Sequence, residues 1–312
     1  METAGTKIKL LSLVFAHNEW SWGLTAGAVH ECLKTEFDVT VEEAREWAKR
    51  PTESDIILSQ NITQFRWFTK FDNIIARLGG NMSFDEKHVV QEYLKNMNAC
   101  YGIIATNQKL KDIASTVNAN ARLIPNGIDL DTWRPNPERK WRYKKPVVGF
   151  VGNIGTPRHS EYKGYPLVKE ACESLKLTLH EALYKTKQVP HDQMKEVFWD
   201  KIDILVLPTA GEGCSNTIME ALACGVPVVT TKVAGFHGEL LTEGQSVLFC
   251  DRTAESVAQA IQAFRADKTL FKKLSENGRR FAEEHHDIKS IAEQYRKLFL
   301  ECHNDATTRS SN

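Results

Sequence analysis

Short apolar runs alternate with amphipathic helical stretches along almost the whole chain, and this alternation constrains the fold more than any other feature. It is typical of βαβ units built around a parallel sheet. In the first part of the chain the candidate strands are Ile8–Phe15, Asp55–Ser59, Asn73–Leu78, Gly102–Thr106 and Arg122–Ile124. The stretches Glu86–Met97 and Gln108–Val117 between them have helical periodicity.

The alternation stops at Pro125 and restarts about twenty residues later, after a polar stretch rich in Pro, Arg and Lys. The second set of candidate strands is Pro146–Val151, Thr178–Leu183, Ile202–Leu207, Val226–Thr231 and Val247–Cys250, and the helical patterns Thr253–Phe264, Thr269–Glu283 and Ile288–Cys302 follow. A chain of 312 residues is long for one core, so we predict two α/β domains. The predicted boundaries are 1–125 for the first domain, 126–145 for a linker, 146–287 for the second domain, 288–303 for a last helix and 304–312 for a disordered tail.

Charge and cysteine content narrow the class of protein. Lys and Arg together number 40, as do Asp and Glu, so the net charge is zero and the basic excess typical of DNA-binding proteins is absent. The seven cysteines are an odd number without a CxxC pair, which indicates a reducing compartment and predicts a cytoplasmic protein. No apolar stretch approaches the ~20 residues of a transmembrane helix.

The segment Pro208–Gly225 is the most informative in the chain. A buried strand leads into a glycine-bearing loop, and a helix is predicted to begin near Ser215 or Asn216 and to end at Gly225. The amides and dipole of such a helix start favour an anion such as phosphate. The alternative is an ordinary βαβ turn with solvated glutamates.

The whole segment resembles the donor-site signature of family-4 glycosyltransferases. Glu212 and Glu220 are eight residues apart, and the motif Glu-Ala-x-Ala-x-Gly-x-Pro-Val-Val follows from Glu220. The resemblance implies the GT-B fold, in which two Rossmann-like, doubly wound parallel-sheet domains face each other across a cleft. It also implies that Glu220 holds the ribose of a nucleotide and that Glu212 contacts the donor hexose. The diphosphate would bind the backbone around Gly213, Cys214, Ser215, Asn216 and Thr217, although Cys214 stands where the family usually has an aromatic residue.

The segment Gly149–Gly164 resembles the family's phosphate clamp. Lys163, followed by Gly164, matches the family's Lys-Gly pair, whereas Asn153 stands in the place of the usual arginine. We expect Lys163 to stabilise the departing diphosphate and Arg158, in a loop that looks lengthened, to replace the arginine. The alternative for Arg158 is a solvated loop residue.

Two further segments resemble parts of the family. Leu123–Pro135 resembles the crossover between domains, where Asn126-Gly127 predicts a hinge, and Glu293–Leu298 resembles the final helix that crosses back onto the first domain. The crossover contains Asp129-x-Asp131, which we do not interpret as a metal site.

The segment Val189–Pro208 resembles the family's helix and strand before the glutamate pair. This resemblance implies that the base of the nucleotide lies near Lys185 to Val189, just ahead of that helix. Phe198 and Trp199, within that helix, are expected to be core residues.

The first domain carries weaker signals. Ala16–Gly27 follows the first strand, and Gly23 stands where the family often has a Gly-Gly loop that contacts donor phosphate or acceptor. Trp20 and Trp22 nearby could stack on a ligand or pack beneath the loop. The family's His after a middle strand is missing, and His17 is a candidate substitute.

By resemblance, the chain is therefore a glycosyltransferase that moves a hexose from a UDP- or GDP-sugar with retention of configuration. The implied mechanism is a front-face displacement that needs neither metal nor cofactor. Two alternatives are a catalytically idle nucleotide-sugar-binding subunit and a sugar-nucleotide epimerase of similar fold. The acceptor (a saccharide, a nucleic-acid base, a lipid or a small molecule) and the oligomeric state stay open at this point.

Overall fold

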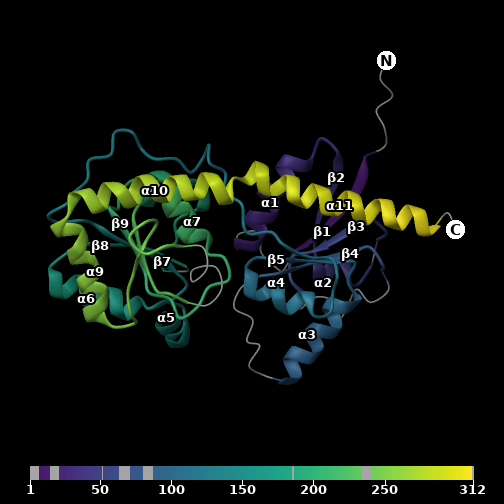
Figure 1. Ribbon diagram of the computed structural model, residues 1–312, viewed down its shortest axis with the longest axis horizontal. Helices are drawn as coiled ribbons and strands as arrows, with labels where there is room; N and C mark the ends of the chain where they lie inside the picture. Colours follow the sequence, from purple (N-terminus) through teal and green to yellow (C-terminus); the bar gives the residue numbers. More distant parts are fainter. Residues whose placement is uncertain are drawn as a thin grey trace, which may run out of the picture. The chain divides into compact units, whose positions relative to one another are not determined.

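The computed structural model describes residues 7–14, 21–50, 52–62, 71–79, 87–184, 186–233 and 241–310. Its contacts divide the chain into two compact units. The first unit comprises Met1–Gly127 together with Ile288–Asn312, and the second unit comprises Ile128–Asp287. Each unit is built around its own parallel sheet with helices packed on it (Figure 1).

The first unit contains a six-stranded parallel sheet in the order β2-β1-β3-β4-β5-β6. Its strands are β1 (Ile8–Val14), β2 (Phe37–Glu43), β3 (Ile56–Ser59), β4 (Ile74–Leu78), β5 (Gly102–Ala105) and β6 (Ala121–Leu123). The central strands β3, β4 and β5 are buried along their whole length, as their continuous apolar runs predict.

Helices cover both faces of this sheet (Figure 1). The helices are α1 (Ser21–Leu33), α2 (Ala44–Trp47), α3 (Lys87–Ala99), α4 (Gln108–Ser115) and α11 (Ile288–Ser310). Residues of α2, α3 and α4 form the core on one face, and residues of α1 and α11 form the core on the other. The last helix therefore completes the first unit, although the whole second unit separates it from the other elements in the sequence.

Three expectations for the first unit need correction. The segment from Ser21 is helix α1 rather than a loop, so Gly23 lies within a helix. β2 was not predicted, because its exposed residues interrupt the apolar run that marks a buried strand. The predicted disordered tail is wrong for residues 304–310, because α11 continues to Ser310 and the Tyr101 hydroxyl donates to Asp305 Oδ2 at 2.8 Å.

The second unit contains a five-stranded parallel sheet in the order β11-β10-β9-β7-β8. Its strands are β7 (Val148–Gly152), β8 (Leu179–Leu183), β9 (Ile204–Leu207), β10 (Val228–Thr230) and β11 (Leu248–Phe249). Its helices are α5 (Pro157–Lys163), α6 (Tyr165–Leu175), α7 (Asn216–Ala223), α9 (Ala254–Ala266) and α10 (Lys268–His286), with a 3-10 turn at His191–Gln193 and a π-helical turn at Lys195–Trp199.

The strand order creates a topological switch point in the second unit. The chain leaves β7 toward β8 on one side and then returns to β9 on the other side of β7. Connections that diverge in this way open a crevice at the carboxyl ends of the two strands, where doubly wound sheets bind ligands. The loops that follow β7 and β9 are therefore the first place to look for a site.

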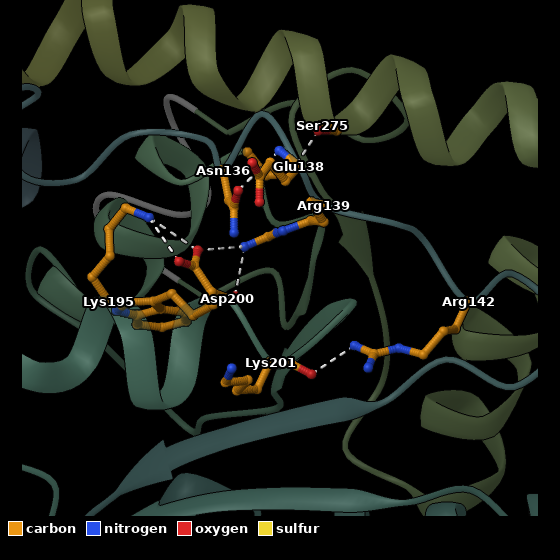
Figure 2. Close-up of polar contacts among 10 residues, drawn as sticks. Asn136, Glu138, Arg139, Arg142, Lys195, Asp200, Lys201 and Ser275 are labelled. Atoms are coloured by element: carbon orange, nitrogen blue, oxygen red, sulfur yellow. Dashed lines mark hydrogen bonds and ion pairs between the residues drawn. The ribbon is translucent and has the colours of Figure 1, made fainter.

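Residues 128–145, predicted as most of a linker, belong to the second unit. Trp133 is buried, and Arg279 Nη1 donates to the Trp133 carbonyl at 2.7 Å. Figure 2 shows how Arg139 and Lys195 converge on Asp200, with Arg139 at 3.3 Å and Lys195 at 3.0 Å from Oδ1.

Arg142 makes two further contacts between this stretch and the rest of the second unit. Its Nη2 donates to the Lys201 carbonyl at 2.6 Å (Figure 2), and its Nε donates to the buried Asp203 at 2.6 Å. These contacts hold residues 128–145 against the end of the π-helical turn and the start of β9.

Candidate functional site

The loop between β9 and α7 is built on a fully buried strand. Ile204–Leu207 has no exposed residue, and Thr230 Oγ1 of the neighbouring strand donates to the Leu207 carbonyl at 2.8 Å. The loop that follows ends at Ser215, whose hydroxyl caps α7 by accepting from the Ile218 amide. The predicted helix start at Ser215 or Asn216 is confirmed, because α7 begins at Asn216 with Ser215 as its cap.

Lys163 and Glu212 form an ion pair although 49 residues separate them. Lys163 is the last residue of α5, and Glu212 lies in the loop after β9. The backbones also meet, because the Ala210 amide donates to the Tyr162 carbonyl at 2.8 Å. The Lys163 side chain is 28% exposed and that of Glu212 is 13% exposed, so a ligand could still reach the cation.

Gly164 brings these two segments close together. Its backbone φ is +74°, a left-handed conformation that side chains disfavour. A Cβ at this position would lie 2.5 Å from the Pro208 carbonyl oxygen. Because only glycine allows this approach, Gly164 is required where α5 and α6 pack against the end of β9.

The carboxylate of Glu220, in α7, is fixed at both oxygens. Trp199 Nε1 donates to Oε2 at 3.2 Å, and His191 Nε2 lies 3.1 Å from Oε1. Glu220 is only 7% exposed. Burial lowers the pKa of His191, but the hydrogen bond to Glu220 and the negative charge of that residue outweigh burial and raise the pKa above its usual value.

The backbone segment predicted to bind diphosphate surrounds the start of α7. Gly213 and Ser215 are buried, whereas Cys214, Asn216 and Thr217 are partly exposed. The amides at this end of the helix carry a partial positive charge. Lys163 carries a full positive charge, which the ion pair with Glu212 balances.

Asn153, predicted in the place of an arginine, holds the turn after β7. Its Oδ1 accepts from the Gly155 amide at 2.9 Å. Arg158 lies in helix α5 and not in a lengthened loop, and its side chain is exposed. In the described part of the chain, no ion pair or hydrogen bond joins Arg158 to the Lys163–Glu212 pair.

The remaining predicted site residues are less well placed or not described. Val189 is partly buried against the core of the second unit. His17 and Lys185 lie outside the described residues, so the structure does not test them. Gly23 lies in α1, whose backbone is helical there.

Sequence reasoning did not assign His191 to the site, and it treated Trp199 only as core. Trp199 is indeed fully buried, but its indole N–H also faces Glu220. A buried carboxylate requires hydrogen-bond donors. A Glu in the predicted buried helix after β9 is therefore a signal that side-chain donors lie nearby, and the His and Trp of the turns before β9 are such donors.

None of the described helices combines the length and apolar character that a bilayer crossing requires. Within the same part of the chain, no group of three or more His, Cys, Asp or Glu side chains is placed to bind a metal ion. Asp129, of the Asp-x-Asp pair, accepts from the Asp131 amide at 3.0 Å in a local turn.

Comparisons with known proteins support the fold and the domain. Residues 164–267 match the family described as Glycosyl transferases group 1. A Bacillus subtilis glycosyltransferase assigned to teichuronic acid biosynthesis is 28% identical over 190 residues, covering 53% of this chain and 47% of that protein. The capsular polysaccharide biosynthesis glycosyltransferase CapM of Staphylococcus aureus is 26% identical over 199 residues, covering 56% of this chain and 52% of CapM. The chain thus spans about half the length of these two relatives.

Among solved structures, HepE of Anabaena in complex with UDP-glucose superimposes with a TM-score of 0.76 at 15% identity, covering 94% of this chain and 100% of HepE. At this identity the likeness concerns the fold alone. The matched family segment contains both Glu212 and Glu220 and begins directly after Lys163. The second unit therefore contains a segment similar to the glycosyl transferases group 1 family, and the chain has the two-domain α/β architecture of the GT-B fold.

Proposed function

We propose that this chain is a retaining glycosyltransferase that moves a hexose from a UDP- or GDP-sugar to an acceptor hydroxyl without a metal ion. The observation that carries the proposal is the Lys163–Glu212 ion pair at the switch point of the second sheet. Glu212 lies in the loop that leads into the start of α7, and the second carboxylate, Glu220, lies eight residues further along, in α7.

The donor would bind along this edge of the second unit. Lys163 and the backbone at the start of α7 would hold the diphosphate, since both are sources of positive charge. Glu212 would accept from a hydroxyl of the hexose, and Glu220 would accept from the ribose. HepE, which shares the fold, has been solved with UDP-glucose, and this supports a nucleotide sugar as the ligand class.

The proposed transfer is a front-face displacement. The acceptor oxygen bonds to the anomeric carbon on the face that the diphosphate leaves, and the bond from that carbon to the phosphate oxygen breaks. The acceptor proton passes to the departing phosphate oxygen. Lys163 and the α7 amides stabilise the charge that develops on the diphosphate, and such electrostatic stabilisation is usually the largest single contribution to catalysis.

Donor binding must compete with the ion pair of the ligand-free protein. Lys163 is neutralised by Glu212 before the donor arrives, because the two side chains are in contact. A diphosphate would draw Lys163 toward itself and release Glu212 to the sugar hydroxyls. This exchange predicts that UDP or GDP alone binds more tightly to a Glu212→Gln variant than to the unmodified protein.

The proposal is tested by donor binding and turnover. We expect one of UDP-glucose, UDP-N-acetylglucosamine or a GDP-hexose to bind in calorimetry, and Glu220→Ala to weaken that binding. Lys163→Ala should lower kcat about 100-fold or more, as removal of one stabilising group does in other enzymes. Lys169→Ala is a matched control, because Lys169 is an exposed lysine on α6 that forms an ion pair with Glu173 and does not belong to the proposed site.

Near-normal turnover in both site variants would remove this assignment. Product analysis separates the alternatives. Release of the nucleoside diphosphate with the sugar in its original anomeric configuration supports transfer or hydrolysis. A donor left intact after binding indicates an idle binding subunit, and a donor whose sugar is epimerised indicates an epimerase.

A further inference from the structure

The buried carboxylate of Glu220 receives its two hydrogen bonds from one short segment of the chain. His191 opens the 3-10 turn and Trp199 ends the π-helical turn that follows it. The His191 ring reaches Oε1 at 3.1 Å and the Trp199 indole reaches Oε2 at 3.2 Å. The carboxylate is therefore held from both sides by donors that are not part of α7.

These two bonds use only half of the acceptor capacity of the group. An ionised carboxylate has two oxygens with about four acceptor positions in total. One donor on each oxygen leaves one further position on each oxygen. Two acceptor positions on neighbouring oxygens match the two adjacent hydroxyls of a vicinal diol, as in ribose.

The two donors themselves have little freedom to move. Trp199 is fully buried in the core of the second unit. The His191 ring packs against the ring of Trp133, with centroids 5.0 Å apart and an interplanar angle of 62°. Arg279 holds the backbone of Trp133 by donating to its carbonyl at 2.7 Å. The orientation of the Glu220 carboxylate is thus determined by packing, and not by its own side-chain rotamer alone.

Charge strengthens the same contact. The charged groups that act on His191 are Glu220 across the hydrogen bond and Asp192 beside it, and both raise the pKa of the imidazole. The imidazole donates from Nε2 in either protonation state, because the carboxylate can only accept. The charged imidazole makes the stronger bond.

We infer that His191 and Trp199 are positioning residues that aim the Glu220 carboxylate at the ribose diol of the donor nucleotide. The inference rests on the proposed function, since it assigns an orienting role within the nucleotide part of that same site. It has a specific consequence: discrimination between ribonucleotides and 2′-deoxyribonucleotides depends on residues that do not touch the nucleotide.

The test measures the dissociation constants of UDP, GDP and their 2′-deoxy counterparts by calorimetry. In the unmodified protein we expect the ribonucleotide of the preferred base to bind about tenfold or more tightly than its deoxy form, because a hydrogen bond to a charged acceptor is lost in the latter. His191→Ala should reduce this ratio several-fold and mainly by weakening the ribonucleotide. His191→Gln should restore part of the ratio, because its amide can donate from nearly the same place.

Trp199→Phe removes the second donor while keeping an aromatic ring in the core. It should lower the same ratio, and a melting measurement checks that the variant is folded. His285→Ala is the matched control, since His285 is 47% exposed on α10 and contacts Glu284 and Phe281 instead of Glu220. The control should leave both the affinity and the ratio unchanged.

The contact between His191 and Glu220 can also be tested without a nucleotide. In NMR titrations the pKa of His191 should fall when Glu220 is replaced by Gln, and an unchanged value would overturn the coupling. If the unmodified protein prefers ribonucleotides and both His191→Ala and Trp199→Phe keep that preference, the inference is wrong while the proposed function stands. If the unmodified protein binds neither UDP nor GDP, the proposed function and the inference fall together.

Discussion

Replacing Gly164 by Ala tests the close approach on which the candidate site depends. The residue has φ +74° and would place its new Cβ 2.5 Å from the Pro208 carbonyl oxygen and 2.7 Å from Pro208 Cγ. Real Cβ contacts do not occur at such distances, so either α5 or the loop after β9 must shift.

The expected cost has two parts. The left-handed backbone conformation costs an alanine about 1–2 kcal/mol. Relief of the collision adds about 1–3 kcal/mol, as overpacking of a well-packed region does. We therefore expect Gly164→Ala to lower the free energy of unfolding by about 2–5 kcal/mol, which corresponds to a melting temperature lower by about 5–15 °C for a unit of this size.

Gly244 provides the control that separates the two parts. Its φ is +65°, but a Cβ built there has nothing within 4 Å. Gly244→Ala should thus show only the backbone cost of about 1–2 kcal/mol. Urea denaturation of both variants gives the difference, which reports the collision with Pro208 alone. An equal loss of unfolding free energy in the two variants would refute the inference that Gly164 is required for the close approach to Pro208, just before the loop that contains Glu212.

Three further predictions concern stability. His30 is 7% exposed, neither ring nitrogen has a hydrogen-bond partner in the described part of the chain, and burial lowers its pKa from 6.5 to about 4. Its neutral form is required in the folded state, so stability is lost as the pH falls from 6.5 toward 4. Between pH 8 and pH 5 the free energy of unfolding should fall by about 2 kcal/mol because of His30, and His30→Leu should remove this part of the fall. Denaturation at both pH values measures it, and an unchanged pH dependence in the variant would contradict the prediction. Asp203 is fully buried and accepts from the Val147 amide at 2.7 Å and from Arg142, so Asp203→Asn should cost about 1–3 kcal/mol in the same assay. By contrast, Arg296→Ala breaks an exposed ion pair with Glu36 and should change the free energy of unfolding by less than about 1 kcal/mol; a larger loss would indicate a packing role.

Sequence periodicity was sufficient for the elements that are buried on both faces. β4 and β9 are continuous apolar runs, and the structure buries every residue in them. Periodicity did not reveal β2, an edge strand whose burial pattern includes exposed residues. The same limit explains α5, a short helix without buried residues that resembled a loop in the sequence.

Sequence motifs likewise predicted part of the candidate site. The spacing of Glu212 and Glu220 predicted a loop and a helix start at the carboxyl end of a strand, and the structure places them there. The motif could not show that Lys163 would contact Glu212, because the contact depends on how α5 packs over the loop. Nor could it show that Trp199 and His191 hold Glu220, because residues in different turns become neighbours only when the core is packed.

The α/β class, the division into two domains and the place of the glutamate-bearing loop could all be predicted from the amino-acid sequence. These follow from local regularities: the period of apolar residues, the turn residues and the spacing within one segment. The folded arrangement was needed to show which distant side chains meet, that residues 128–145 belong to the second unit, and that the last helix completes the first unit. The physical reason is that charge pairing and close packing depend on distances in space, which a linear pattern specifies only within a few residues along the chain.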